Sequence, residues 1–283
     1  MTEHAFSADS RAVFESAYPE TPILLQHRLL DNPLLTLPAL VELAASLPSS
    51  QVEYNPGALP IGIDPADIPS PKLSIADTIR SIEENGSWMV LKFIEQNPVY
   101  SALLSETLRE LDPIIHPKTG EMLTLQGFIF ISSPRAVTPF HFDPEHNILM
   151  QIRGNKVMTI FPADDEEVAS PLAHEAFHRG EHHRNLKWND GFAAKGKAFP
   201  LTSGDAIYVP IKSPHWVQNG DEVSISLSVT WRSAWSYAEA DARAFNHILR
   251  GRGLSPTSPK RYPSQNVAKS VAYRALRKLG LAR

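Results

Sequence analysis

The sequence predicts a mainly β domain with flanking helices. Between residues 121 and 232, six short runs rich in β-branched and aromatic residues are separated by Gly, Asn, Asp and Pro, which is typical of a sandwich or barrel. Apolar residues at helical spacing occur before and after this segment. With 283 residues, of which 42% are hydrophobic and 20% charged, the chain is long enough to bury a sizeable core.

A helical flank is expected over residues 1–120. "TLPALVELAASL" has Thr36 as a plausible N-cap and a proline in its first turn, and Ser74 with Asp77 forms a capping-box pattern ahead of "IADTIRSIEEN". "NPVYSALLSETLREL" places its leucines at helical spacing. "WMVLKFI", which is short and bounded by turn signals, reads as a buried strand.

The strands of the β-core are expected in six runs: "MLTLQGFIFIS", "AVTPFHFD", "NILMQIRG", "KVMTIFP", "DAIYVP" and "VSISLSVTW". Gly154 and Asn155 read as a two-residue hairpin loop with glycine at the position that a type II′ turn needs, and this loop would pair Gln151 with Met158. Cross-strand partners share a face. The polar side chains that would then project together are Asn147, Gln151, Arg153 and Lys156.

A histidine and an aspartate lie two residues apart in "TPFHFDPEHN". On a strand, His141 and Asp143 project to the same side and could hold one metal ion. The pair alone carries little weight, since chance predicts roughly one such match in a chain of this composition. Further along, His215 stands between Pro and Trp, and the last strand presents a hydroxyl-bearing face beside an apolar one. These polar side chains face either solvent or a polar cavity inside the barrel. Both faces of the strands are otherwise apolar enough to be covered, which favours a polar cavity.

Two histidines and one carboxylate with open coordination positions are the ligand set of non-haem Fe(II) oxygenases. The stretches "AVTPFHFDPEHNILMQIRGNKVMTIFP" and "GDAIYVP…HWVQN…SISLSVTW" resemble the JmjC (cupin-type) Fe(II)- and 2-oxoglutarate-dependent dioxygenases, particularly the asparaginyl-hydroxylase branch that includes factor inhibiting HIF. The resemblance implies a double-stranded β-helix (jelly-roll or cupin) core at residues 121–232, followed by a basic helical extension at residues 233–283.

The same resemblance implies a role for individual residues. The iron ligands that it implies are His141, Asp143 and His215. Lys156 would pair with the distal carboxylate of 2-oxoglutarate, Thr138 would supply a hydroxyl partner, and Asn147 would lie near the end of the cosubstrate that binds the metal. The implied reaction uses O₂ to convert 2-oxoglutarate to succinate and CO₂ while it hydroxylates, or demethylates, a peptide side chain or a small molecule.

Two other functions stay open for the same core. A cupin enzyme that does not use 2-oxoglutarate would need the metal but not Lys156, and a binding module would have kept the barrel without turnover. The chain also departs from the asparaginyl hydroxylases, which carry an amide just before the closing aromatic of the last strand, where this chain has Val229 and Thr230. Glu145 and His146 could reach a substrate or lie in an exposed loop. The aromatic residues that could line a substrate pocket, or simply pack, are Trp188, Trp216 and Trp235.

Residues 163–203 are polar and irregular, and we expect an excursion from the β-core that covers the site. This segment contains His174, His178, His182 and His183. Three of them are four residues apart, so a helix would stack them on one face. They could form a second metal site, although a solvated lid is the simpler expectation.

The C-terminal extension is basic, since residues 242–283 contain ten Lys and Arg and no acidic residue. Its last helical pattern carries an apolar stripe that includes Val267, Val271 and Leu279, which we expect to pack on the body or on a second subunit in a homodimer. Nucleic-acid binding through this tail is a weaker alternative than docking on the acidic body.

No apolar run approaches the roughly 18 residues that a membrane-spanning helix needs. The N-terminus lacks the basic start and apolar stretch of a secretory signal, so the cytoplasm is the expected compartment. The chain has no cysteine, which excludes disulfides and thiolate ligands and leaves imidazole and carboxylate as metal-binding groups.

Overall fold

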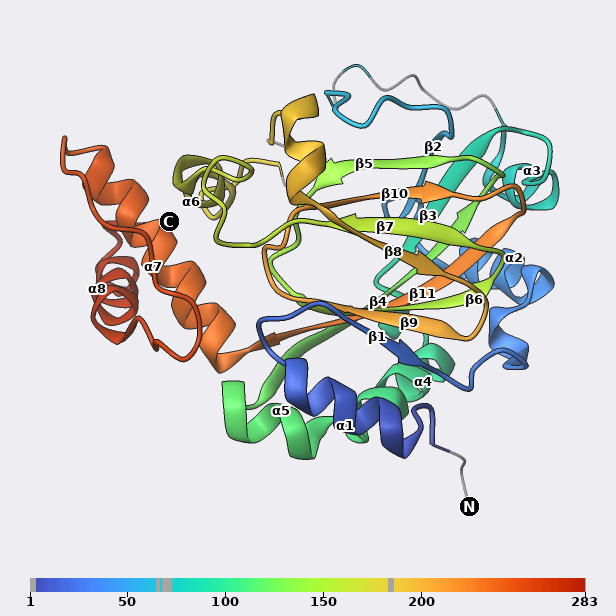
Figure 1. Cartoon of the computed structure of the whole chain (residues 1–283), viewed down its shortest axis with the longest axis horizontal. Helices are drawn as coiled ribbons and strands as arrows, with labels where there is room; N and C mark the ends of the chain where they lie inside the picture. The colour runs from blue at the N-terminus through green and yellow to red at the C-terminus, as the bar shows by residue number, and fades with distance from the viewer. Residues whose placement is uncertain (1–3, 65–66, 68–72, 183–185, 283) are drawn as a thin grey trace.

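Two antiparallel β-sheets face each other in the structure, a computed structural model that describes residues 4–64, 67, 73–182 and 186–282 (Figure 1). The strands are β1 (Ile23–Gln26), β2 (Val52–Pro56), β3 (Ser87–Lys92), β4 (Met122–Ser132), β5 (Val137–His141), β6 (His146–Arg153), β7 (Lys156–Ile160), β8 (Lys197–Leu201), β9 (Asp205–Val209), β10 (His215–Asn219) and β11 (Ser224–Ser233). The seven-stranded sheet has the order β1-β9-β6-β11-β4-β3-β2, and the four-stranded sheet has the order β5-β10-β7-β8.

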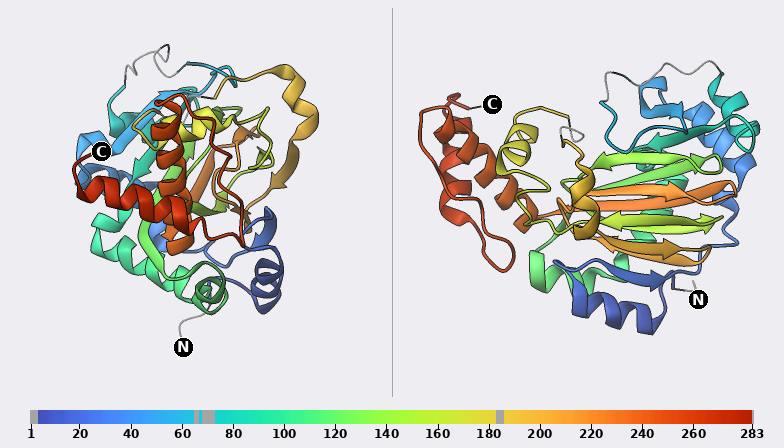
Figure 2. Two further views of the ribbon diagram at one scale, coloured as in Figure 1. Left: turned by 90° about the vertical axis from the view of Figure 1, so that its left-hand side faces the viewer. Right: turned by 45° about the horizontal axis from the view of Figure 1, so that its top comes forward.

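Helices flank this β-core on one face and at its ends (Figures 1 and 2). The α-helices are α1 (Ala8–Ala17), α2 (Leu37–Ser46), α3 (Ile75–Arg80), α4 (Pro98–Arg109), α5 (Asp112–Thr119), α6 (Pro171–Phe177), α7 (Ala234–Arg250) and α8 (Val267–Lys278). Short 3-10 helices lie at Pro33–Leu35, Ser49–Gln51, Ile94–Gln96 and Asp190–Lys195. The predicted fold class, mainly β with flanking helices around a jelly-roll core, is confirmed.

The expected hairpin at Gly154 is wrong in its pairing. Gly154 does have a positive φ of 72°, as such a turn requires. However, β6 lies between β9 and β11 in the larger sheet, whereas β7 lies between β10 and β8 in the smaller one. Gln151 is paired with Ser226, and Met158 with Val217 and Phe199. The turn therefore carries the chain from one sheet to the other.

The side-chain directions predicted from the alternation along each strand are nevertheless largely correct. Asn147 and Lys156 line the same cavity between the sheets, although they come from opposite sheets. Gln151 also points inward, where its amide nitrogen donates to the hydroxyl of Ser224. Arg153, in contrast, is exposed at the end of β6. Side chains alternate between the two faces of a strand whichever strand is its neighbour, so the wrong pairing did not change their predicted directions.

The outer face of the larger sheet is covered by the N-terminal helices. Phe14 of α1, Leu104 of α4 and Ile115 of α5 are buried in one apolar cluster with Ile148 of β6 and Leu227 of β11. Figure 1 shows these helices side by side along that face. Burial of apolar area on both faces explains why the strands read as nearly continuous apolar runs.

Residues 1–120 are not only a helical flank. They add β1 at one edge of the larger sheet and β2 with β3 at the other. The sequence predicted β3 but neither β1 nor β2, and α3 ends at Arg80 although its pattern extends further. β4 begins at Met122 and β11 ends at Ser233. The division into domains at residues 120 and 232 stays a prediction.

The excursion at 163–203 is only partly irregular. It contains α6, and its last part forms β8, which extends the smaller sheet beside β7. After β11, α7 and α8 pack together at the end of the barrel (Figure 2). Arg250 pairs with Glu175 and Arg261 pairs with Glu20, so part of the basic extension docks on acidic groups of the body.

The apolar stripe of α8 faces away from the body. Ser270 and Tyr273 are the buried residues of this helix, whereas Val267 and Val271 are each 60% exposed. The expectation that the stripe packs on the chain's own body is therefore wrong. Across the part of the chain that the structure describes, no helix is both long and apolar enough to cross a membrane.

Candidate metal centre and cosubstrate pocket

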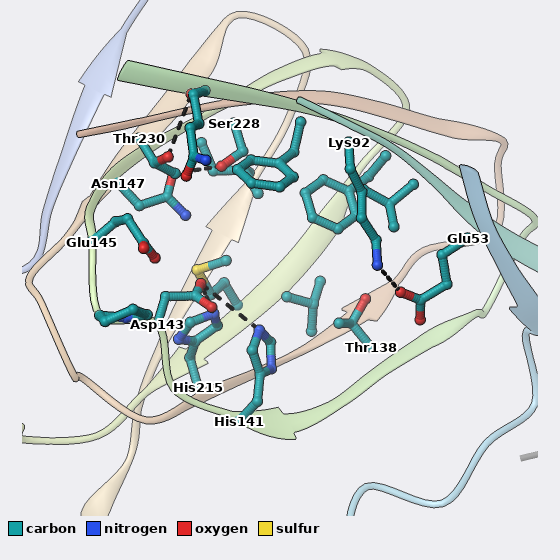
Figure 3. Close-up of a pocket in the computed structure, with 18 of the residues that line it drawn as sticks. Glu53, Lys92, Thr138, His141, Asp143, Glu145, Asn147, His215, Ser228 and Thr230 are labelled. Atoms are coloured by element: carbon teal, nitrogen blue, oxygen red, sulfur yellow. Dashed lines mark hydrogen bonds and ion pairs between the residues drawn. The ribbon is translucent and has the colours of Figure 1, made fainter. Parts of the chain in front are cut away.

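His141, Asp143 and His215 converge at one end of the barrel (Figure 3). His141 ends β5 and His215 begins β10, and the two residues are cross-strand partners. The carboxylate oxygen Oδ2 of Asp143 lies 3.9 Å from Nε2 of His141 and 3.7 Å from Nε2 of His215. One potential ligand atom from each residue lies within 4.8 Å of the others, so a single metal ion could contact all three.

Hydrogen bonds fix which imidazole nitrogen faces the centre. Nδ1 of His141 lies 2.7 Å from the carbonyl oxygen of Pro139, and Nδ1 of His215 lies 2.9 Å from that of Ser213. A carbonyl can only accept, so each Nδ1 carries the proton and each Nε2 presents a lone pair. Outer hydrogen bonds of this kind orient histidine ligands in metal sites. Two neutral imidazole nitrogens and one carboxylate therefore form a donor set that suits a divalent metal.

A cavity of about 330 Å³ opens beside the three ligands, between the two sheets. Its walls combine apolar side chains of the larger sheet with the polar residues that the sequence singled out. The predicted site residues that line it are Thr138, His141, Asp143, Asn147, Lys156 and His215. The structure thus brings all six together, from four strands and one loop.

Lys156 is a buried cationic residue of this cavity. Its side chain is 5% exposed, and burial lowers its pKa from 10.5 to about 7. Among the described residues, no carboxylate lies within ion-pair distance of its ammonium group. A buried charge is costly unless it is paired, so an anionic ligand in the cavity would supply the missing partner.

Asn147 is held by the hydroxyl-bearing face of β11. The Ser228 hydroxyl donates a 2.7 Å hydrogen bond to Oδ1 of Asn147, which leaves the amide nitrogen directed towards the cavity (Figure 3). Thr230 lines the cavity next to it and donates to the carbonyl of Gln126 at 3.4 Å. The residue at which the sequence departs from the expected amide thus places a threonine hydroxyl in the cavity wall. The expected polar interior is confirmed.

The sequence missed two charged residues of the cavity wall. Lys92 of β3 and Glu53 of β2 form an ion pair that lines the same cavity as Thr138 (Figure 3). Lys92 was detectable, because it alternates with Trp88 and Val90, which line the same wall. Glu53 was not, because β2 carries no clear strand pattern.

Glu145 and His146 point to opposite sides of β6 and its preceding loop. Glu145 lines the cavity, where burial and the neighbouring Asp143 carboxylate raise its pKa to about 7. His146 is fully buried on the outer side and lies 2.9 Å from the hydroxyl of Tyr208. Burial lowers the pKa of His146 well below its usual value, so it is a neutral residue of the core.

None of the three tryptophans that could have lined the cavity does so. Trp188 and Trp216 pack with Phe140 and Phe161 in a separate apolar cluster, and Trp235 donates its indole N–H to the carbonyl of Ser264. Packing is the commoner role of a large aromatic residue near a β-core. The tryptophan that does line the cavity is Trp88.

The histidines of the excursion do not form a second centre within the described residues. His174 is buried in α6 and His178 is half-buried at its C-terminal end, and desolvation lowers the pKa of each well below its usual value. Over residues 4–64, 67, 73–182 and 186–282, the only group of three suitable ligands is His141, Asp143 and His215. His183 lies outside the described residues. His182 and Phe177 line the cavity, so the excursion contributes to the wall of the site.

Several known proteins are similar to this chain. Jumonji C domain-containing protein 5 of Drosophila melanogaster is 29% identical over 107 residues, which are 34% of this chain and 25% of that protein. Lysine-specific demethylase 8 of Danio rerio is 27% identical over 100 residues, which are 34% of this chain and 24% of that protein. The matched segment spans about a quarter of the length of these relatives.

The fold is similar to that of solved structures. The ribosomal oxygenase YcfD of Escherichia coli, in a complex with cobalt and 2-oxoglutarate, has a TM-score of 0.53 at 17% identity, covering 99% of this chain and 68% of that one. A second structure of the same protein has a TM-score of 0.55 and covers 69% of that chain. The sequence profile of the cupin-like domain matches residues 80–237. The predicted JmjC (cupin-type) assignment is confirmed, and this chain belongs to the Cupin_8 family of cupin-like domains.

Proposed function

We propose that this chain is an Fe(II)- and 2-oxoglutarate-dependent dioxygenase. The observation that carries the proposal is the pairing of two features in one cavity. Three neutral or anionic ligands converge at one end, and a buried ammonium without a protein carboxylate lies in the same space. A metal-chelating dicarboxylate satisfies both features at once, because one end can bind the metal while the other pairs with Lys156.

Each residue of the site has a defined task in this reaction. When bound, Fe(II), 2-oxoglutarate and O₂ supply the oxidative decarboxylation that yields succinate and CO₂ and hydroxylates a C–H bond. His141, Asp143 and His215 hold the metal, and three protein ligands leave coordination positions open. Lys156 neutralises the distal carboxylate of 2-oxoglutarate, with the Thr138 hydroxyl as a further polar partner on the cavity wall.

Asn147 and the apolar wall complete the site. Ser228 fixes the Asn147 amide so that its N–H groups can donate to the metal-bound end of the cosubstrate. Trp88, Phe128 and Phe130 line the cavity and would limit the access of water to it. Exclusion of water protects reactive species from side reactions.

We propose hydroxylation rather than demethylation as the outcome, with a peptide side chain or a small molecule as substrate. A cavity of this size holds the cosubstrate and one small group. The similar proteins named above include one called a ribosomal oxygenase and one called a lysine-specific demethylase. The absence of cysteine agrees with a reducing compartment, and the cytoplasm stays our prediction.

The first test is optical. The protein is loaded with Fe(II) without oxygen, 2-oxoglutarate is added, and the visible metal-to-ligand charge-transfer band is recorded. We expect a band in the wild type and none in His215→Ala. A wild type that binds metal but gives no band would favour a cupin that does not use 2-oxoglutarate.

Substitutions of two lysines of the cavity provide a matched test of 2-oxoglutarate binding. Lys156→Ala should weaken 2-oxoglutarate binding at least a hundredfold with the metal content unchanged, because it removes the cation that lacks a carboxylate partner. Lys92→Ala is the control, since Lys92 lines the same cavity but is already paired with Glu53. Equal loss in both variants, or no loss in Lys156→Ala, would contradict the assigned role of Lys156.

A further inference from the structure

One loop contacts two of the three candidate metal ligands. Residues 210–214 connect β9 to β10, and the backbone N–H of Lys212 donates a 2.7 Å hydrogen bond to the backbone carbonyl of Asp143. The next residue, Ser213, supplies the carbonyl that lies 2.9 Å from Nδ1 of His215. The conformation of this short loop therefore sets the positions of Asp143 and His215 relative to each other.

Lys212 holds that loop in an unusual conformation. Its φ is 58°, in the left-handed region that a residue with a side chain rarely adopts. Such a conformation persists only where the surrounding structure fixes it, and it is frequent near functional sites. The N–H that reaches Asp143 belongs to the same residue, so a relaxation of this φ would break the contact with the metal ligand.

The side chain of Lys212 ties the loop to the C-terminal helix. It is 1% exposed, and its ammonium group pairs with the carboxylate of Glu239 on α7, which also accepts from Arg243. Burial opposes ionisation of Glu239, but Arg243 and Lys212 outweigh it and hold the pKa of Glu239 well below its usual value. Burial lowers the pKa of Lys212, and the neighbouring Glu239 carboxylate opposes that shift. The direct contact between the two buried side chains anchors α7 to the loop.

Stability does not explain this arrangement well. A buried ion pair replaced by apolar residues of similar volume is often as stable or more stable. What the pair does provide is a fixed direction for the Lys212 side chain, and through it a fixed backbone. Lys212 itself does not line the cavity.

We infer that Lys212 is a positioning residue of the metal centre: its ion pair with Glu239 of α7 holds the 210–214 loop in the conformation that presents Asp143 and His215 to one metal ion. The inference rests on the proposed metal site, and it adds the C-terminal helix to the parts of the chain on which metal affinity depends. Outer contacts of metal ligands commonly change affinity by 10- to 100-fold.

The test uses Mn²⁺ and Co²⁺ alone, without 2-oxoglutarate. Lys212→Met keeps the buried stem and removes the charge, while Glu239 keeps its contact with Arg243. Mn²⁺ affinity is measured by the electron paramagnetic resonance signal of the free ion, and the geometry of the site by the visible bands of Co²⁺. Glu175→Gln is the matched control, because it removes a second ion pair of α7, between Arg250 and the buried Glu175, that does not touch the loop.

We expect Mn²⁺ affinity to fall at least tenfold in Lys212→Met, with altered Co²⁺ bands, and to stay within twofold of wild type in Glu175→Gln at a similar loss of thermal stability. Should Lys212→Met fail to fold, Glu239→Gln is expected to show the same effects more weakly. Unchanged Mn²⁺ affinity and Co²⁺ bands in a folded variant would overturn the inference alone. A wild type that binds neither ion would overturn the proposed metal centre as well.

Discussion

His141 and His215 face each other across neighbouring strands, with their ring centroids 4.2 Å apart and each Nδ1 committed to a backbone carbonyl. Their Nε2 atoms are thus held ready for a shared ligand before any ligand arrives. Only a small rearrangement is needed on binding, so the free energy of metal binding should appear directly as stability of the folded state.

Metal addition should therefore raise the melting temperature. At a free Mn²⁺ concentration of about 100 times Kd, the free energy of unfolding should increase by about 2.7 kcal/mol. His215→Ala should abolish the increase. His116→Ala, which changes an exposed histidine on α5, should keep it. Thermal denaturation with and without Mn²⁺ measures both, and an equal increase in all three proteins would place the metal elsewhere.

The pKa of Lys156 predicts a pH dependence of cosubstrate binding. Because burial lowers this pKa from 10.5 to about 7, the unfolded chain binds the extra proton between these values, and stability of the ligand-free protein should rise with pH across that window. 2-Oxoglutarate favours the protonated lysine. Its affinity should accordingly fall above pH 7, by up to about tenfold per pH unit, with uptake of a proton.

Titration calorimetry in buffers of different ionisation enthalpy measures that proton uptake. Glu145 also titrates near pH 7 in the same cavity, so Glu145→Gln is the control and should retain the dependence. If the dependence disappears in Glu145→Gln, or if the wild type binds equally well from pH 6 to 9, the protonated Lys156 is not the partner of the ligand.

The role of Ser228 can be isolated with its neighbour Ser226. Each donates a 2.7 Å hydrogen bond from β11 to an amide on β6, Ser228 to Asn147 in the cavity and Ser226 to Gln151 further along the barrel. Either change to alanine should cost roughly 1 kcal/mol of stability. Only Ser228→Ala should also raise the Kd of 2-oxoglutarate, by about 3- to 10-fold. Equal cosubstrate affinity in the two variants would contradict the role of Asn147.

The site was more predictable than the pairing that builds it. Side-chain alternation is a property of one strand, so the inward direction of Asn147 and Lys156 followed from the sequence. Which strand pairs with which depends on distant parts of the chain. Gly154 and Asn155 satisfy the same local turn rules whether the turn closes a hairpin or carries the chain from one sheet to the other. The error therefore concerned β6 and β7 together and left their faces intact.

Contacts between residues far apart in the chain could not be predicted from the sequence. Lys212 and Glu239 are 27 residues apart, and nothing local distinguishes them from solvated charges. Glu53 reaches the cavity because β2 extends the edge of the sheet beyond β3. Similarly, the stripe on α8 was recognised by its spacing, but its exposure depends on which face of the helix α7 covers.

The exposed stripe of α8 leads to the last prediction, which concerns assembly. Val267 and Val271 are each 60% exposed and Leu279 is 71% exposed, on a helix whose other side is already packed. We propose that a second copy of the chain covers this stripe. Val271→Glu should then convert a dimer to a monomer in sedimentation velocity, whereas Val99→Glu, at a 56% exposed valine on α4, should not. Point substitution is the cleaner test, because truncation after residue 240 would separate Glu239 from Arg243 and disturb the core of α7. A wild type that sediments as a monomer at high concentration would contradict the proposal.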